Sequence, residues 1–477
     1  MFDILITSGT AVMPTECSQM DIGIIGERIA EIGPTGTLNR AAARMVIDAD
    51  GLFVLPGGVD PHVHYSGPGT PAGGVLPESQ DYSAAAAFGG VTTVIDFAFQ
   101  TGSGSLHEAI EQKRAEADGR MAVDYGLHAG FLGNPAFDVL DEIGDAIKKG
   151  LPTFKAFMIY PGWVMDDGHL WGVMTRVAEH GGLTVVHAED AALVEWLTAK
   201  YVREGKTHGA YIVETRPPLV EETAIRRALL LAERSGSSVY FVHVSSALGM
   251  QALGDARRRG LVAFGETTAP YLSFTAEKLW DDDHGLLWAT TPPLKYAADR
   301  DALWDGLATD ELQVAASDHF VVSIEDKYER MGTTIQSLMG GYDGVELRVP
   351  ILFHSGVQEG RLTLRRFVDV VSATPAKIMG LYPRKGCLAP GADADIMIID
   401  PARTWTVHWE DLHTSAHYCP WEGWELKGKV VTTLLRGSIL VRDERYVGSK
   451  TGGRFVPRTL ADEVRSKGVP DLVKDHA

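Results

Sequence analysis

The chain has 477 residues, of which 45% are hydrophobic and 22% charged, with 52 glycines and 23 prolines. These proportions are typical of a folded globular protein and exclude a disordered chain, a collagen and a coiled coil. Acidic residues outnumber basic ones by 63 to 44, and at a net charge of −19 most of the surface repels a polyanion, so we expect no nucleic-acid partner.

The sequence predicts neither a membrane span nor a secretory signal. No run of about 18 uninterrupted apolar residues is present, and the first eight residues lack a basic segment ahead of an apolar core. We therefore expect a cytoplasmic protein with no membrane partner. The three cysteines, Cys17, Cys387 and Cys419, are too few and too far apart for a disulfide framework or a cysteine-based zinc site. Any metal would be held by His, Asp, Glu or Lys.

Both ends of the chain have the pattern of β-sheet. Residues 3–32 form short alternating runs punctuated by Gly and Pro, and residues 395–400 and 430–442 show the same pattern. Because neither end alone is large enough to bury a core, we predict one small β-sandwich domain built from both. The expected boundaries are 1–55 and 385–477 for this domain, which includes the C-terminal tail, and 56–384 for a larger domain inserted between them.

The inserted segment alternates eight short apolar runs with stretches of helical spacing. Since parallel strands buried on both faces are nearly all apolar, the alternation predicts an α/β fold of the (β/α)8 TIM-barrel type. The eight predicted strands are 52–59, 92–98, 122–128, 152–159, 183–188, 238–244, 261–266 and 313–318. The helical stretches are 79–89, 105–118, 137–149, 169–180, 221–234, 247–259 and 299–309.

Polar residues stand at the ends of several predicted strands, where the loops of such a barrel build the active site. His62 and His64 follow the first run, and at positions i and i+2 of an extended segment their rings face one side and can converge on one ion. His187 and His243 each interrupt an apolar run, and a single histidine there is often a satisfied core residue. Asp318 ends the eighth run, where it could act as a general base beside a metal or cap a following helix.

A lysine inside the fourth apolar run, Lys155, is unusual because burying a charged amine is costly unless it is paired or neutralised. One alternative is a buried salt bridge or an outward-facing side chain. The other is reaction of the neutral amine with carbon dioxide, which gives an anionic carbamate that can bridge two cations.

Several motifs together resemble one family. They are LPGGVDPHVHY with AAAAFGGVTTVIDFA, then TFKAFMIY, VVHAED, FVHVSS, TPPL, AASDHF, ATPAKIMGLYPRKGCLAPGADADIMIID and TTLLRG. In this order they resemble the amidohydrolase superfamily, and within it the dihydropyrimidinase and hydantoinase branch of cyclic amidases. The resemblance covers nearly the whole chain.

The resemblance implies a dinuclear centre, with zinc as the expected metal, although such ligands also accept manganese or cobalt. One ion is expected at His62, His64, carbamylated Lys155 and Asp318, and the second at Lys155, His187 and His243. Two cations ~3.5–4 Å apart can share a hydroxide and polarise the substrate carbonyl. Asp318 is expected to be the proton acceptor.

Three further positions follow from the resemblance alone. Tyr160 is expected to steady the tetrahedral oxyanion, while Thr291 and Gly340 are expected to bind substrate through backbone groups, where hydantoinases usually carry Ser and Asn. The segment after the second histidine, residues 65–69, lacks the Arg found there in dihydroorotases and many allantoinases. A carboxylate-bearing substrate such as dihydroorotate would therefore lack its bidentate partner.

The resemblance thus implies a hydrolase that opens a cyclic amide or ureide ring, with a homotetramer as the expected assembly. Two enzymatic alternatives remain, an allantoinase and a cyclic imide hydrolase. A non-enzymatic alternative is a scaffold of the collapsin response mediator kind, which resembles dihydropyrimidinases but has lost metal ligands. Because all six ligand positions are filled here, the enzyme is favoured, while the ring substrate and its stereochemistry stay open.

Overall fold

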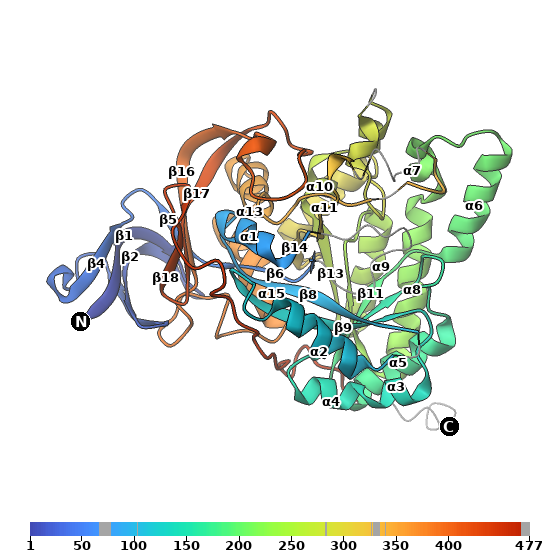
Figure 1. Ribbon diagram of the computed structural model, residues 1–477, viewed down its shortest axis with the longest axis horizontal. Helices are drawn as coiled ribbons and strands as arrows, with labels where there is room; N and C mark the ends of the chain where they lie inside the picture. The colour runs from blue at the N-terminus through green and yellow to red at the C-terminus, as the bar shows by residue number, and fades with distance from the viewer. Residues whose placement is uncertain are drawn as a thin grey trace.

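The computed structural model describes residues 1–65, 78–102, 104–281, 284–325, 327, 334–338 and 340–468. Its two main sheets lie beside each other (Figure 1). The first, at one end of the molecule, combines strands from both ends of the chain. The second lies within a layer of helices, so the chain is divided into a terminal sheet and a barrel.

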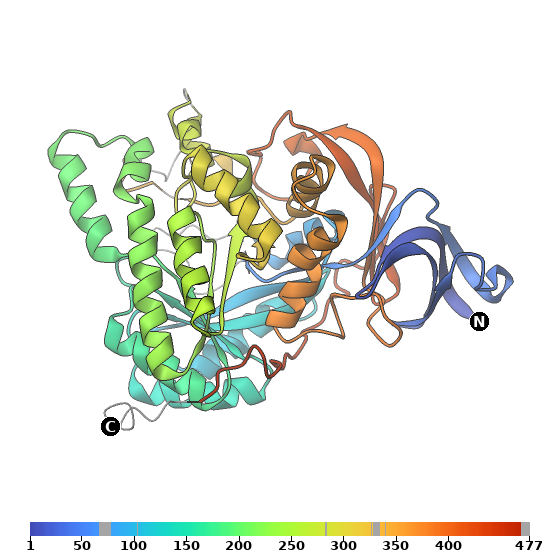
Figure 2. The same cartoon turned by 180° about the vertical axis from the view of Figure 1, so that it is seen from behind.

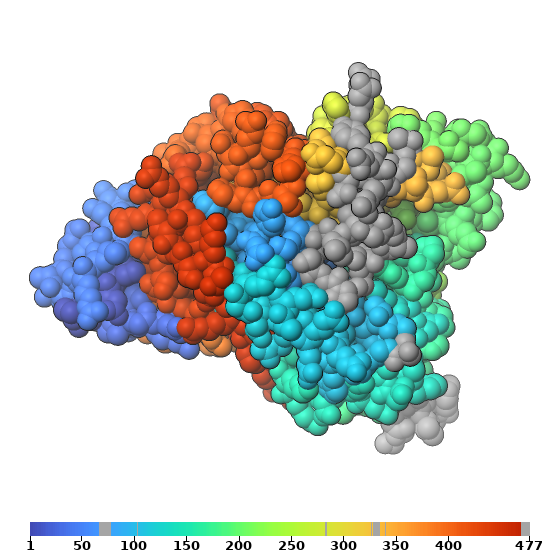
Figure 3. All heavy atoms as spheres, viewed as in Figure 1, coloured from blue at the N-terminus to red at the C-terminus, as the bar shows by residue number. Residues whose placement is uncertain are grey.

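Within the described part of the chain, the terminal sheet has nine strands, and β5 (Phe53–Pro56) joins its two halves. β5 pairs in parallel with β1 (Phe2–Val12) and antiparallel with β16 (Ile396–Thr406), so N-terminal and C-terminal strands share one sheet. Figure 3 shows the N-terminal part of the chain, blue, next to red residues of the C-terminal part on one face of the surface. The other strands are β2 (Cys17–Ile25), β3 (Arg28–Pro34), β4 (Ala43–Asp48), β17 (Glu425–Leu435), β18 (Ser438–Arg442) and β19 (Arg445–Tyr446).

As far as the structure describes the chain, the second sheet contains eight parallel strands whose spatial order follows the chain. They are β6 (Gly58–Asp60), β8 (Val91–Thr101), β9 (Asp124–Leu132), β10 (Thr153–Phe157), β11 (Leu183–His187), β12 (Ser238–Phe241), β13 (Ala263–Thr268) and β14 (Val314–Ala316). Two short strands that continue from the first and last of these, β7 (Val63–His64) and β15 (His319–Phe320), pair with each other in parallel and join the two ends of the sheet. The predicted (β/α)8 barrel is confirmed.

The first predicted strand, residues 52–59, is wrong in one respect, because it is split between the two sheets. β5 belongs to the terminal sheet and β6 starts the barrel, with Gly57 between them. The amide of Gly57 donates to the Asp395 carbonyl at 2.9 Å, and a Cβ at this position would lie 2.3 Å from Oγ1 of Thr92. Only glycine allows the backbone to pass this close to Thr92. The sequence did not reveal the division, because a continuous apolar run does not show where a chain passes from one sheet to another.

Helices cover the outside of the barrel (Figure 2). α2 (Leu106–Ala117) begins at a capping box formed by Ser105 and Glu108, and α8 (Pro218–Ser235) ends where Gly236 adopts a left-handed conformation, φ 74°. The remaining α-helices are α1 (Ala84–Phe88), α3 (Phe137–Asp141), α4 (Ile143–Lys148), α5 (Asp167–Glu179), α6 (Ala191–Arg203), α7 (Ile212–Thr215), α9 (Ala247–Arg258), α10 (Ala269–Ser273), α11 (Ala297–Thr309), α13 (Arg348–Leu352), α14 (Leu364–Val368) and α15 (Thr374–Ile378). Short π-helical turns span Phe353–Gln358 and Asp369–Ala373.

The last described residues lie against the barrel and not on the terminal sheet. The amide of Val456 donates to the Tyr125 carbonyl at 2.8 Å, next to the start of β9. The guanidinium of Arg458, 2% exposed, donates to Oγ1 of Thr153 at 2.7 Å at the start of β10. Val456, Leu460 and Val464 join the apolar cluster inside the barrel. This segment therefore covers the end of the barrel where the strands begin.

Among the described helices, none combines the length and hydropathy required for a membrane span. The three cysteines are free.

Candidate active site

The residues selected from strand ends come together at the C-terminal end of the barrel. Oδ1 of Asp318 lies 3.1 Å from Nε2 of His62 and 3.3 Å from Nε2 of His64. The ring of His243 lies 5.5 Å from that of His62 and 4.3 Å from that of His187, measured between centroids. Four imidazoles and one carboxylate thus form one connected cluster.

Lys155, in β10, is 1% exposed and lies among aromatic rings. Its Nζ is 5.3 Å from the ring centroid of Phe97 and 5.1 Å from that of Phe157. Burial lowers the pKa of Lys155 to about 7, although Glu266 and Asp318 act to raise it. The described residues contain no carboxylate close enough to form an ion pair with this amine, so the salt-bridge alternative has no support there.

The backbone is strained at three of these residues. Tyr160, His243 and Asp318 have positive φ values of 77°, 40° and 51°, which residues other than glycine rarely adopt and which concentrate at functional sites. Asp318 is followed by β15 and not by a helix, so the helix-cap alternative is wrong.

The donor set fits divalent cations. Nδ1 of His243 is buried and has no hydrogen-bond partner among the described residues, which leaves one nitrogen of a buried imidazole free for a ligand. Burial would raise the pKa of Asp318, but His62, His64 and His243 hold it well below its usual range, so the carboxylate is ionised. His62, His64 and Asp318 offer ligand atoms within 4.8 Å of one another, as a metal site requires.

Tyr160, Thr291 and Gly340 lie together beside this cluster. The Tyr160 ring is 5.2 Å from the His187 ring between centroids. Burial raises the pKa of Tyr160, and a hydrogen bond with Thr291 acts to lower it. A Cβ at Gly340 would lie 2.9 Å from the backbone nitrogen of Thr291, so only glycine allows the two segments to pack this closely. Residues 66–69, where the absence of Arg was noted, lie outside the described residues.

Two buried carboxylates that contact site histidines were missed from the sequence. Glu266 pairs with Nδ1 of His62, and Glu189 lies 2.8 Å from Nε2 of His187. A signal was present, because Glu266 ends a predicted apolar strand and Glu189 follows another. An acidic residue at the end of an apolar run is, however, also common where a loop begins. Spacing alone therefore did not distinguish these two glutamates from ordinary loop residues.

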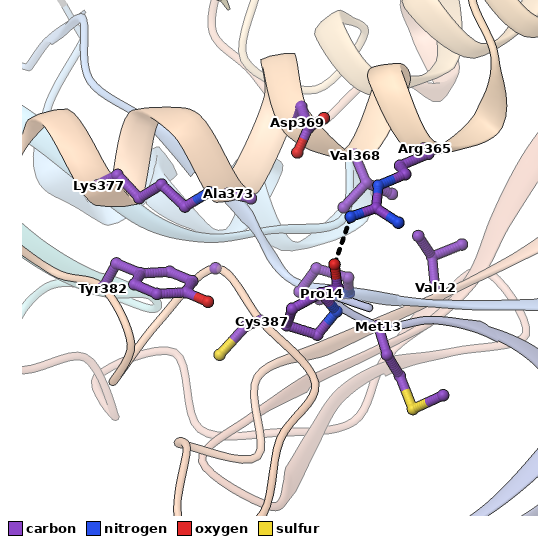
Figure 4. Close-up of a pocket in the computed structure, with 12 residues that line it drawn as sticks. Val12, Met13, Pro14, Arg365, Val368, Asp369, Ala373, Lys377, Tyr382 and Cys387 are labelled. Carbon is purple, nitrogen blue, oxygen red and sulfur yellow. Dashed lines mark hydrogen bonds between the residues drawn. The ribbon is translucent and has the colours of Figure 1, made fainter. Parts of the chain in front are cut away.

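A small pocket lies elsewhere, between the terminal sheet and the helices that follow α13. Figure 4 shows the guanidinium of Arg365 donating to the Pro14 carbonyl at its edge, with Lys377, Tyr382 and Cys387 nearby. None of the six expected metal ligands lines it, so we assign the chemistry to the strand ends and not to this pocket.

A barrel that carries four histidines, a buried lysine and an aspartate at the C-terminal ends of its strands has the arrangement of a metal-dependent hydrolase. Residues 53–440 match the model of the amidohydrolase family, and the chain belongs to this family.

Named relatives match along almost the whole chain. The D-hydantoinase of Geobacillus stearothermophilus is 38% identical over 459 residues, which cover 95% of this chain and 96% of the relative. The D-hydantoinase of Streptomyces coelicolor is 37% identical over 460 residues, with 95% and 97% covered. The crystal structure of dihydropyrimidinase from Brevibacillus agri superposes with a TM-score of 0.91 at 35% identity, covering 96% of this chain and 99% of that one.

Proposed function

We propose that this amidohydrolase opens the ring of a cyclic amide or ureide by hydrolysis, in the manner of a dihydropyrimidinase or hydantoinase. The observation that carries the proposal is the approach of Asp318 to both His62 and His64 beside the buried Lys155. The similarity to D-hydantoinases over nearly the full length supports the same reaction. All six ligand positions are filled, which argues against a non-catalytic scaffold.

We further propose that the site holds two divalent cations, most simply Zn²⁺, with Mn²⁺ or Co²⁺ as alternatives. The proposed ligands are His62, His64, carbamylated Lys155 and Asp318 for one ion, and Lys155, His187 and His243 for the other. When bound, such ions make water more acidic and polarise a carbonyl group.

Proton transfer, stabilisation of the oxyanion and orientation of the substrate are assigned to side chains and backbone groups of this chain. Asp318 would accept a proton from the attacking water as its oxygen adds to the ring carbonyl carbon, and would deliver that proton to the ring nitrogen as the C–N bond breaks. The raised pKa of Tyr160 keeps its hydroxyl protonated, so it can donate to the carbonyl oxygen as negative charge develops. Backbone groups at Thr291 and Gly340 would orient the amide.

The first experiment measures metal content and hydrolysis on the same preparation. Elemental analysis of protein produced with added zinc is expected to give close to two equivalents, since the ligands are too many for a single tetrahedral ion. The substrates are dihydrouracil, hydantoin, 5-substituted hydantoins, allantoin, succinimide and dihydroorotate. Turnover of dihydrouracil or a hydantoin supports the proposal, whereas preferred turnover of allantoin or succinimide would assign the chain to an alternative hydrolase. Folded protein without metal or turnover would refute it.

We also propose a homotetramer and a cytoplasmic location, both from the resemblance. Light scattering on the purified protein tests the first, and fractionation of the source cells tests the second.

A further inference from the structure

Glu266 contacts ligand residues assigned to both ions. It lies in β13 and is fully buried, at 0% exposure. Its Oε1 pairs with Nδ1 of His62 and accepts the backbone amide of His243 at 3.2 Å. Its Oε2 accepts the hydroxyl of Tyr240 at 2.6 Å. One carboxylate therefore contacts the side chain of one ligand and the strained backbone of another.

These contacts determine which ring nitrogen of His62 is available. Both oxygens of Glu266 already accept hydrogen bonds, from the His243 amide and the Tyr240 hydroxyl. Nδ1 of His62 is therefore the donor in its contact with Glu266, and the lone pair is on Nε2, the atom that faces Asp318. The bond to the His243 amide also supports a backbone with φ 40°, which is unfavourable without such a constraint.

Glu189 contacts a ligand residue of one ion only. Its Oε2 lies 2.8 Å from Nε2 of His187 and accepts a hydrogen bond from Arg216, also at 2.8 Å. The proton of His187 is therefore on Nε2, which leaves Nδ1 as the free lone pair. Among the site histidines, Glu189 forms a hydrogen bond with His187 alone.

We propose that Glu266 is a positioning residue shared by both metal ions, whereas Glu189 positions a ligand of the second ion only. The inference rests on the proposed function, since the assignment of ligands to the two ions comes from it. Carboxylates that bind the outer nitrogen of a ligand histidine fix its orientation and raise its basicity, and their loss typically weakens metal binding by about 10–100-fold. The structure therefore predicts different effects for two buried glutamates.

The test is a titration of metal-free protein with Zn²⁺ alone, in competition with a chelator. Glu266→Met keeps the bulk but removes the acceptor, and should weaken both ions by about 10–100-fold. Glu266→Gln keeps one acceptor oxygen and replaces the other by an amide NH₂ group, and should show a smaller loss for both ions. Glu189→Met should weaken one ion and leave the other at wild-type affinity.

A matched control is Glu346→Met. Glu346 is also largely buried and accepts from the amide and Nδ1 of a histidine, His413, that is not an expected ligand. Its loss should leave the affinity for both ions unchanged. Thermal unfolding of the metal-free variants separates damage to the fold from loss of binding, and Glu266→Gln decides the question if Glu266→Met does not fold.

Wild-type affinity for both ions in a folded Glu266 variant would overturn the proposal. So would a Glu266 variant that loses affinity for one ion only, or a loss of affinity in Glu346→Met equal to that in Glu266→Met. These outcomes differ from failure of the proposed function, in which the wild-type protein itself would bind no Zn²⁺.

Discussion

Oδ1 of Asp318 lies 3.1 Å from Nε2 of His62, although one residue follows the last barrel strand and the other the first. The contact lies where β7 and β15 join the ends of the sheet. Asp60 reinforces the same junction, since its Oδ1 accepts the amides of His62 at 3.3 Å and Ser317 at 3.2 Å. The contacts that close the barrel therefore also bring the residues of the candidate site together.

Replacing Lys155 by alanine is expected to remove both metal ions and the hydrolytic activity, because the proposed carbamate is the ligand common to both. A short carboxylic acid such as propionate should partly restore both by supplying the missing carboxylate. Metal content and turnover, measured with and without the acid, check this, and the acid should not raise wild-type activity. Unchanged metal content and turnover in Lys155→Ala would refute the bridging role.

Asp318→Asn keeps the side-chain size and one coordinating oxygen but does not accept a proton at neutral pH. We expect kcat to fall by about 10²–10⁴-fold, the usual contribution of general acid–base catalysis, with most of the metal retained. The control is Asp166→Asn, at an aspartate that caps α5 by accepting from the amide of His169 at 2.9 Å. Near-normal turnover of metal-replete Asp318→Asn would remove Asp318 from the mechanism.

Asp343 should make stability depend on pH. Burial raises the pKa of Asp343 to about 7, with His319 lowering it and Glu346 and Glu78 raising it further. The folded protein therefore holds this proton up to a higher pH than the unfolded chain, whose Asp pKa is about 3.9. The contribution of Asp343 to the free energy of unfolding is fully present below about pH 4 and is lost as pH rises to about 7.

Asp343→Asn preserves the shape and removes this titration. Urea unfolding of the variant, compared with wild type over this range, should show the variant gaining relative stability as pH rises. A constant difference between the two proteins at every pH would show that Asp343 does not titrate in this way.

Lys385 joins the terminal sheet to the barrel through ion pairs with three buried aspartates. Its Nζ lies 2.6 Å from Asp124 at the start of β9, and 3.1 and 2.7 Å from Asp393 and Asp395 just before β16. Lys385→Met would leave these charges without that partner and should lower the free energy of unfolding by about 3–5 kcal/mol. Urea denaturation measures this.

The control for Lys385 is Lys148→Met, since Lys148 is exposed on α4 and, among the described residues, forms an ion pair with Asp145 alone. A change within about 0.5 kcal/mol is expected there. Equal effects of the two substitutions would mean that the buried cluster adds nothing to stability.

The barrel was predictable because its strands are buried on both faces. Such strands appear in the sequence as short, nearly continuous apolar runs. Helices such as α5 and α9 were predictable for a similar reason, since one face packs on the sheet. By contrast, α6 was not predicted, and only Val194 among its residues is buried, so it carries little apolar periodicity. The division of residues 52–59 between two sheets depends on a contact with Asp395, far along the chain, which local pattern cannot reveal.

For the site, the sequence supplied the residues whose chemistry is rare in apolar strands, such as Lys155 and His187. It did not supply Glu266, because its importance lies in a contact with His62 that exists only after the barrel has closed. The position of Tyr160 also depends on the tertiary structure. Strand alternation does not place its ring beside His187; the backbone turn at Tyr160, with a φ of 77°, does.

The segment beneath the barrel has a consequence for synthesis in the cell. Val456, Leu460 and Val464 cover apolar side chains such as Val185 and Tyr240 inside the barrel, yet they are translated after all eight barrel strands. Until they emerge, a nascent chain with all eight strands made still exposes this apolar end to water and to other chains. Release of a chain shortened before Val456 would therefore yield an aggregation-prone substrate for chaperones, even though every proposed metal ligand had been translated.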